Sequence, residues 1–204
     1  MFVIDSIRRN DNSNEALIIV DRERFRVTVH DLEALNIQEG DVVDDDVMEE
    51  IVQASERLSC IKKAFEYLSY GDLSEKQLRD KLSKKFNFDL ATDVASLLVE
   101  RGYVNDARLA ERYAETFYVF KNMGLKRIRN ELYRRGISSD DIENALSKYE
   151  NEDQSDRIEE FVRKKYDISR LDDVNYRRKV YAGAMRAGFS SSDVCDFLRN
   201  FESE

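Results

Sequence analysis

The sequence predicts a mostly α-helical chain of three tandem three-helix repeats with a small antiparallel β element at its N-terminus. The 204 residues contain no proline, which breaks helix interiors. Strand signals occur only in the first 30 residues, whereas an apolar period of 3.6 residues runs from about Leu58 onward. A corner at Gly136 returns 52 residues later at Gly188. Because repeats of this kind contact only their neighbours, we expect an elongated, curved solenoid.

The composition indicates a folded protein of a reducing compartment. Hydrophobic residues make up 42% of the chain, which is enough for a packed core. The two cysteines, Cys60 and Cys195, are widely separated and belong to no paired motif, so we expect them to be small core residues. No apolar run approaches the roughly 20 residues that span a membrane, and the N-terminus lacks the features of a signal peptide. We therefore expect a cytoplasmic protein that does not contact membranes.

Charge is distributed unevenly along the chain. Residues 1–56 hold 5 Lys/Arg against 15 Asp/Glu, a net charge of −10. Residues 57–149 hold 18 against 14, a net charge of +4, and residues 150–204 hold 10 against 13, a net charge of −3. DNA phosphates would repel the acidic head, which argues against the whole surface lying on nucleic acid.

Residues 1–56 are expected to form an acidic N-terminal extension. Three short runs, FVIDSI, EALIIV and FRVTV, are rich in β-branched residues and are separated by the turn candidates RNDNSN and DRER. A short helix, a turn at Gly40 and a second helix should follow. Acidic residues complement the positive end of a helix dipole, so the run Asp44–Asp46 marks the start of that second helix.

Residues 57–103 are expected to form the first three-helix repeat. Its first helix, LSCIKKAFEYLSY, should end before Gly71. The second, SEKQLRDKLSKKF, opens with Ser74 and Gln77 at capping-box spacing and places Leu78, Leu82 and Phe86 on one face. The third, DLATDVASLLVERGY, should end at Gly102 as its C-cap.

Residues 104–150 and 151–204 are expected to form the second and third repeats. Gly136 predicts a left-handed helix end, and Ser138 with Asp141 matches a helix start signal. The core positions of the second repeat recur 52 residues later, where Ile128, Leu132, Gly136, Ile137, Ser138, Ile142 and Leu146 correspond to Val180, Ala184, Gly188, Phe189, Ser190, Val194 and Leu198. The acidic run ENEDQSD between the two repeats is the best candidate for a hinge.

The sequence contains no recognisable active site. His30 is the only histidine, and no phosphate-binding loop, dinucleotide fingerprint, nucleophile elbow or zinc-protease motif occurs. The many carboxylates fit helix caps and solvated helix faces. We therefore predict a non-enzymatic protein with no catalytic residue, no metal and no cofactor.

Basic residues in the second and third repeats are the candidate contact residues. Burial of Ile128 and Leu132 would leave Arg127, Asn130 and Arg134 on one exposed stripe. Lys or Arg recurs at 126 and 178, at 127 and 179, and at 134 and 186, which favours a shared contact surface over an ordinary solvated face. The predicted partner-binding residues are Lys126, Arg127, Arg129, Arg134, Arg178 and Lys179.

The same corner does not fit a DNA-reading helix-turn-helix. A recognition helix places its N-terminal residues against base edges and phosphates. Here those positions hold Asp140, Asp141 and Glu143, and the third repeat has Asp193 and Asp196. Sequence-specific reading by these helices is therefore not expected.

Four further runs lie between about Ile61 and Phe201, namely AFEYLSYGDLSEKQLRDKL, ERGYVNDARLAERYAE, GLKRIRNELYRRGIS and RAGFSSSDV. Together they resemble the RecX family of RecA regulators. The chain departs from the family pattern at Gly71–Leu73, where an arginine is usual ahead of Ser74. It departs again at Gly183, where a better helix former is usual.

The resemblance implies a protein that lies in the groove of the RecA–ssDNA filament and spans neighbouring protomers. It would inhibit ATP hydrolysis, strand exchange and stimulation of repressor cleavage. The basic residues would then pair with acidic groups of RecA or with the DNA phosphates of the filament. We expect a monomer, and the role of the acidic extension stays open. The alternative is a nucleic-acid-binding protein that acts through the same basic helices without RecA.

Overall fold

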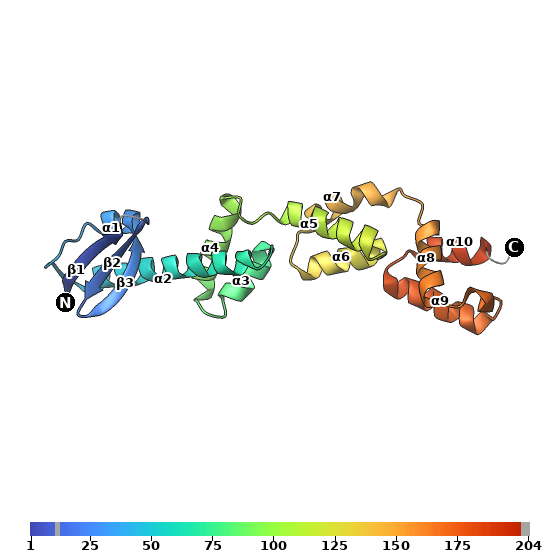
Figure 1. Ribbon diagram of the computed structural model, residues 1–204, viewed down its shortest axis with the longest axis horizontal. Helices are drawn as coiled ribbons and strands as arrows, with labels where there is room; N and C mark the ends of the chain where they lie inside the picture. The colour runs from blue at the N-terminus through green and yellow to red at the C-terminus, as the bar shows by residue number, and fades with distance from the viewer. Residues whose placement is uncertain (11–12, 201–204) are drawn as a thin grey trace. The chain divides into compact units, whose positions relative to one another are not determined.

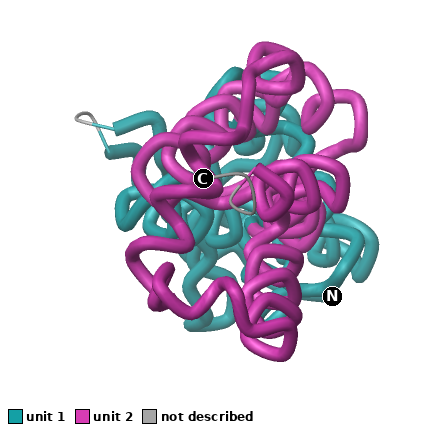
Figure 2. Tube along the Cα trace, turned by 90° about the vertical axis from the view of Figure 1, so that its right-hand side faces the viewer, with its two compact units in different colours: residues 1–72, 78–104 teal, residues 73–77, 105–204 magenta. Residues whose placement is uncertain are grey.

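The computed structural model describes residues 1–10 and 13–200, and Figure 1 shows the order of its elements. The chain divides into two compact units, which Figure 2 distinguishes by colour. The first unit holds residues 1–72 and 78–104, and the second holds residues 73–77 and 105–204. The expected combination of a mostly helical chain and an N-terminal antiparallel β element is confirmed.

The first unit begins with an antiparallel sheet in the order β3-β2-β1-β4. Its apolar side chains alternate, so that Ala16, Ile18 and Val20 of β2 are buried. The predicted turn RNDNSN includes Asp11 and Asn12, which lie outside the described residues. The short strand β4 pairs with β1 and was not predicted. The strands are β1 Phe2–Asn10, β2 Glu15–Val20, β3 Glu23–Thr28 and β4 Val42–Val43.

Two helices follow this sheet, as predicted. The helix α1 Val29–Leu35 starts in a capping box at Thr28, and Gly40 has a positive φ of 86° in the turn that follows. The Asp44 carboxylate accepts a hydrogen bond from the Val47 amide at 3.1 Å and so caps the helix α2 Asp45–Ser69. This single helix of 25 residues crosses the predicted boundary between residues 56 and 57. That boundary therefore falls inside a helix.

The helices α3 Glu75–Leu82 and α4 Phe88–Glu100 follow α2. The predicted capping box is present, because the Gln77 amide donates to Ser74 Oγ at 3.1 Å and the Ser74 amide donates to Gln77 Oε1 at 3.2 Å. Helix α3 ends at Leu82, earlier than predicted, and Asn87 then caps α4. Gly102 has a positive φ of 74° just past the end of α4, as expected for a C-cap glycine.

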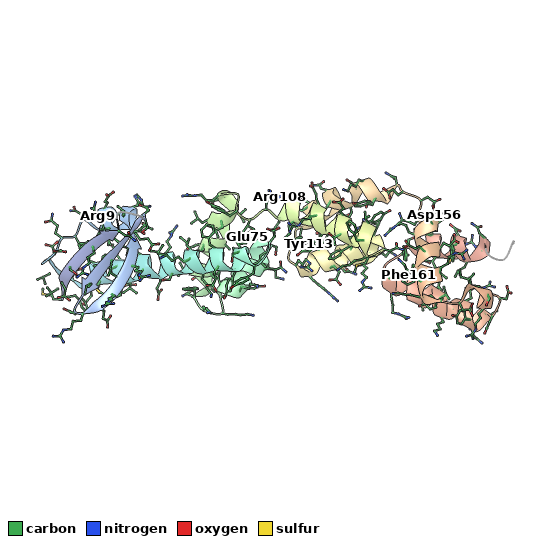
Figure 3. The ribbon with its side chains drawn as sticks, in the orientation of Figure 1. Arg9, Glu75, Arg108, Tyr113, Asp156 and Phe161 are labelled. Atoms are coloured by element: carbon green, nitrogen blue, oxygen red, sulfur yellow. The ribbon has the colours of Figure 1, made fainter. Side chains whose placement is uncertain are left out.

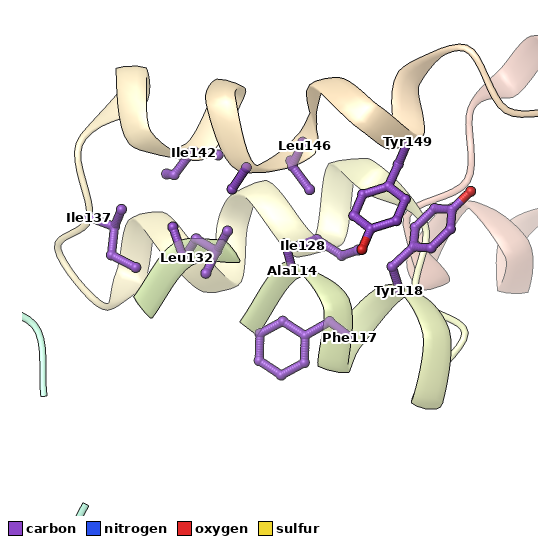
Figure 4. Close-up of a cluster of buried hydrophobic side chains, with 11 residues drawn as sticks. Ala114, Phe117, Tyr118, Ile128, Leu132, Ile137, Ile142, Leu146 and Tyr149 are labelled. Carbon is purple, nitrogen blue, oxygen red and sulfur yellow. The ribbon is translucent and has the colours of Figure 1, made fainter. Parts of the chain in front are cut away.

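The second unit contains the three-helix group around Ile128, which packs a continuous apolar core (Figure 4). Ile128 and Leu132 are fully buried, and the rings of Tyr118 and Tyr149 stack with centroids 4.0 Å apart. Gly136 has a φ of 83° and Ser138 Oγ accepts from the Asp141 amide at 3.1 Å, which confirms the predicted corner. The elements are α5 Asp106–Glu115, the π-helical turn η1 Thr116–Phe120, α6 Leu125–Arg134 and α7 Ser139–Glu150.

The third three-helix group repeats this corner, and the predicted register of 52 residues is confirmed. Val180, Ala184, Phe189, Val194 and Leu198 are all buried, and Ser190 Oγ accepts from the Asp193 amide at 3.1 Å. Gly183 has a packing reason, because an added Cβ would lie 1.8 Å from Tyr166 Oη. The elements are α8 Ser155–Lys165, the 3-10 turn η2 Ile168–Arg170, α9 Val174–Ala187 and α10 Ser191–Asn200.

The second and third groups meet where the C-terminus of α9 abuts the N-terminus of α6. The Gly124 amide donates to the Ala187 carbonyl at 2.9 Å, and the Lys126 amide donates to the Gly188 carbonyl at 3.1 Å. Helix α6 has no side-chain N-cap, so α9 satisfies donors that a cap would otherwise serve. Both glycines are needed for this approach, since a Cβ on Gly124 would lie 2.1 Å from the carbonyl carbon of Gly188.

The C-terminus of α6 makes a related contact with the first turn of α3, within the second unit. Ser74 Oγ donates a short hydrogen bond to the Arg135 carbonyl. A Cβ on Gly136 would meet the Lys76 side chain at 2.3 Å. The same glycine corner therefore recurs at two successive helix-end contacts, from α9 to α6 and from α6 to α3.

The acidic joint that we predicted as a hinge is bonded to the groups on both sides. Tyr118 Oη donates to Glu152 at 2.6 Å, and Gln154, which is 92% buried, donates to Tyr118 Oη at 3.0 Å. The Arg157 guanidinium donates to the Tyr118 carbonyl at 3.0 Å and to the Met123 carbonyl at 2.9 Å. Arg157 also lies over the Tyr118 ring, 3.5 Å from its centroid.

Substituting Gly124→Ala should open the contact between α9 and α6. Gly124 has φ −68° and ψ 153°, a conformation that alanine adopts freely, so the cost comes from the clash with Gly188 alone. Overpacking of this kind costs about 1–3 kcal/mol. Amide hydrogen exchange at Lys126 should become roughly 5 to 150 times faster, while exchange in α2 stays unchanged.

Ser138→Ala is the matched control for this substitution. Loss of the α7 N-cap costs about 1 kcal/mol, a comparable amount, but leaves the contact between α9 and α6 intact. Equal acceleration at Lys126 in both variants, or none in Gly124→Ala, would contradict the assigned role of the glycine pair.

Candidate partner-binding surface

Helix α6 carries four of the six predicted contact residues, and its core residues set their orientation. Because Ile128 and Leu132 face the core, the intervening positions turn outward. The side chains of Arg127, Asn130 and Arg134 are exposed, so the predicted stripe is present on this helix.

Lys126 and Arg127 lie at the contact between α6 and α9. The Lys126 amide bonds to Gly188, while the Lys126 side chain is exposed. The Arg127 Cβ lies so close to Gly188 that a Cβ on Gly188 would approach it to 2.4 Å. The guanidinium of Arg127 is exposed and makes no hydrogen bond or ion pair with another described residue. The backbone of these two residues is therefore fixed by the contact with α9, while their charged side chains are exposed.

Arg129 has a different environment. Its Nε and Nη2 donate to the two carboxylate oxygens of Glu143 at 2.8 Å each, and Nη2 also donates to Glu150. This bidentate contact lowers the pKa of the Glu143 carboxyl below its ordinary value, and it raises the pKa of Arg129. Because its charge is satisfied within the chain, we assign Arg129 to the scaffold, where it joins α6 to α7.

The remaining predicted residues are exposed. Arg134 is 78% exposed, and its nearest carboxylate, that of Glu131, lies 3.9 Å away. On α9, Arg178 makes no ion pair within the described part of the chain, and Lys179 Nζ lies 5.7 Å from the Tyr176 ring centroid. At a rise of about 1.5 Å per residue, Lys179 is roughly 12 Å along α9 from its last residue. The structure therefore has two pairs of adjacent exposed cations, Lys126 and Arg127 on α6 and Arg178 and Lys179 on α9, and Arg134 at the end of α6.

Sequence reasoning missed the cations and apolar side chains that border the contact between α9 and α6. Lys164 and Lys165 of α8 and the exposed ring of Phe120 lie beside Arg127 in one surface hollow. The run Phe117–Phe120 could have indicated this surface, because a helix cannot bury four consecutive large residues on one face.

Residues 1–10 and 13–200 contain no group of His, Cys, Asp and Glu side chains arranged to hold a metal ion. His30 is exposed on α1, and burial raises the pKa of the Cys60 thiol to about 11, which keeps it protonated and unreactive. In the same described part of the chain, no helix has the length and apolar character needed to cross a bilayer.

Both three-helix groups of the second unit match models of known protein domains. Residues 105–146 match the family model of the second three-helix domain of RecX, and residues 152–198 match that of the third. The regulatory protein RecX of Clostridioides difficile (strain 630) is 27% identical over 179 residues, 87% of this chain and 82% of that protein. Regulatory protein RecX of Clostridium perfringens (strain 13 / Type A) is 28% identical over 166 residues, 79% and 77% of the two chains.

A solved structure, described as the crystal structure of regulatory protein RecX, has a similar fold. It matches with a TM-score of 0.80 and 22% identity and covers 98% of this chain and 100% of that one. At this level of identity, the likeness is evidence for the fold alone.

Substituting Arg129→Gln should destabilise the protein at neutral pH but have little effect in acid. The folded-state pKa of Glu143 is depressed, so its contribution to stability is present above its ordinary pKa of 4.5 and is lost as the pH falls through the folded value. Both side chains are partly exposed, so we expect a loss of only about 0.5–1 kcal/mol. Urea unfolding of both proteins at pH 7 and at pH 3 measures this difference.

Arg134→Gln serves as the control, because Arg134 is 78% exposed and makes only a long contact. Its free energy of unfolding should stay within about 0.5 kcal/mol of the wild-type value at both pH values. A loss in Arg129→Gln that is the same at pH 7 and pH 3 would show that the ion pair with Glu143 does not cause it.

Proposed function

This chain belongs to the RecX family, and we propose that it is a regulatory protein that binds the RecA–ssDNA filament and inhibits RecA. The inhibited RecA activities are ATP hydrolysis, strand exchange and stimulation of repressor cleavage. The chain then has a regulatory role rather than a catalytic one.

The observation that carries this proposal is the recurrence of unpaired cations on equivalent helices. Arg127 on α6 and Arg178 on α9 are exposed, and neither guanidinium has a carboxylate partner among the described residues. They lie on helices joined by backbone hydrogen bonds between Gly124, Lys126 and the end of α9. A surface that repeats along a chain suits a partner that also repeats, such as the successive protomers of a filament.

Weak contacts suffice for such a partner. An exposed ion pair contributes only about 0.2–1 kcal/mol. When one repeat is bound, the next repeat is held near its own site at a high effective concentration, so several weak contacts give tight binding. We propose Lys126, Arg127, Arg134, Arg178 and Lys179 as the contact residues, with acidic RecA groups or the phosphates of the filament as their partners.

The alternative is binding to nucleic acid without RecA, and the exposed cations of α6 and α9 favour it to some degree. The logarithm of the affinity for nucleic acid would then fall linearly with the logarithm of the salt concentration. The acidic extension opposes it, since residues 1–56 carry 15 Asp/Glu against 5 Lys/Arg.

The test is ATP hydrolysis by the cognate RecA on single-stranded DNA, with this protein added at substoichiometric ratios. The rate should fall when only a few copies are present per many RecA protomers. The double variant Arg127→Glu and Arg178→Glu should fold normally and need roughly 5–30 times more protein for the same inhibition, because two weak pairs become repulsive.

The control variant Arg24→Glu and Arg26→Glu makes the same charge change at exposed positions of β3. It should inhibit like the wild type. No inhibition by the wild type, together with salt-sensitive binding to bare DNA, would favour the alternative. Full inhibition by the folded double variant would remove Arg127 and Arg178 from the contact surface.

A further inference from the structure

The π-helical turn η1 exposes two large apolar side chains at the surface of the second unit. Its backbone closes a wide turn, since the Lys121 amide donates to the Thr116 carbonyl at 3.2 Å. Phe117 and Tyr118 are buried, whereas Val119 is 58% exposed and Phe120 is 77% exposed. Val119 and Phe120 are adjacent within this turn and form one exposed apolar patch, and such patches mark contact sites more often than singly exposed residues do.

A surface hollow of about 290 Å³ lies beside this turn. We call it the Phe120 pocket. Its apolar lining comes from Val119, Phe120, Met123, Phe161 and Ala187, and its polar lining from Lys121, Asn122, Arg127, Glu160, Lys164 and Lys165. Figure 3 labels Phe161 on α8, one of the elements that form this lining. The pocket therefore combines residues from the second and third three-helix groups.

The charge of the Phe120 pocket is strongly positive, with four cations against one carboxylate. Only Lys164 pairs with that carboxylate, at 2.8 Å from Glu160. Lys121 Nζ lies 4.9 Å from the Phe117 ring centroid, and Lys165 Nζ lies 4.7 Å from that of Phe161. Neither of these lysines has a carboxylate partner among the described residues, and the Arg127 guanidinium also has none.

We propose that the Phe120 pocket binds an acidic peptide segment that carries an apolar side chain. That side chain packs against Val119 and Phe120, and the flanking carboxylates face Lys121, Arg127 and Lys165. An aromatic anchor beside unpaired cations is the combination that dominates binding at small interfaces. The proposal deepens the proposed function and rests on it, because the segment would belong to the regulated protein.

Two features of the Phe120 pocket favour a peptide over single-stranded nucleic acid. Successive bases stack on a row of exposed rings, whereas of the two aromatic rings in the lining only that of Phe120 is exposed, because Phe161 is 7% exposed and has Lys165 over its ring. The remaining lining is partly aliphatic and concave, which suits an apolar side chain.

The experiment measures fluorescence anisotropy of a labelled 12-residue peptide of Asp and Glu with a central Leu-Phe pair. A matched peptide with Ser-Ser at the centre has the same charge, and a labelled 12-nucleotide oligothymidylate tests the nucleic acid. The Leu-Phe peptide should bind at least about tenfold more tightly than the Ser-Ser peptide and the oligonucleotide.

Phe120→Ser should weaken binding of the Leu-Phe peptide at least about tenfold and leave the weaker binding of the Ser-Ser peptide unchanged. Phe88→Ser is the matched control, since Phe88 is 58% exposed on α4 in the first unit, and it should bind like the wild type. Circular dichroism melts of both variants establish that they fold.

The proposed peptide site would be overturned by any one of three results. These are equal affinity for the two peptides, tighter binding of the oligonucleotide, or unchanged affinity of Phe120→Ser for the Leu-Phe peptide. None of these results bears on the proposed function, which inhibition of RecA by the wild-type protein tests separately. If the wild-type protein does not inhibit RecA, the proposed function fails, and the peptide measurements still show whether the Phe120 pocket binds an acidic segment.

Discussion

The contact that organises the second unit is a pair of backbone hydrogen bonds between the ends of two helices. The first amides of α6 have no side-chain cap, and the last carbonyls of α9 accept their hydrogen bonds. This arrangement also aligns the negative end of one helix dipole with the positive end of the next. Only glycine allows the approach, because a Cβ at Gly124 would lie 2.1 Å from Gly188. The polar network of Tyr118, Gln154 and Arg157 then connects the same two groups.

The candidate surface follows from that contact. Lys126 and Arg127 belong to the turn whose amides α9 binds, so their position depends on the helix ends rather than on a flexible loop. The hydrogen bonds from Arg129 to Glu143 connect α6, the helix that carries the exposed stripe, to α7. Arg129 is thus paired within the chain and joins two helices, whereas Arg127 on the same helix is unpaired and exposed.

Much of the fold could be predicted from the sequence, because local signals and packing agree. The corner at Gly136 and Ser138 and its copy at Gly188 and Ser190 have the predicted conformation and register. The partners of Arg129 could not be predicted, since Glu143 and Glu150 lie on the following helix and nothing in the spacing selects them. Residues 45–69 form one helix because no breaker interrupts them, although the change in charge at residue 56 suggested a boundary. The π-helical turn Thr116–Phe120 was not predicted, because the apolar period of the sequence does not distinguish it from an α-helix.

The most direct test of this account is detection of the hydrogen bonds between the helix ends by NMR. A long-range HNCO experiment detects scalar coupling across a hydrogen bond, from an amide nitrogen to the carbonyl carbon that accepts it. The account predicts cross-peaks from Lys126 to Gly188 and from Gly124 to Ala187 in the wild-type protein. Absence of both, with the peak from Ile128 to Gly124 within α6 present, would contradict the claim that these helix ends join the repeats.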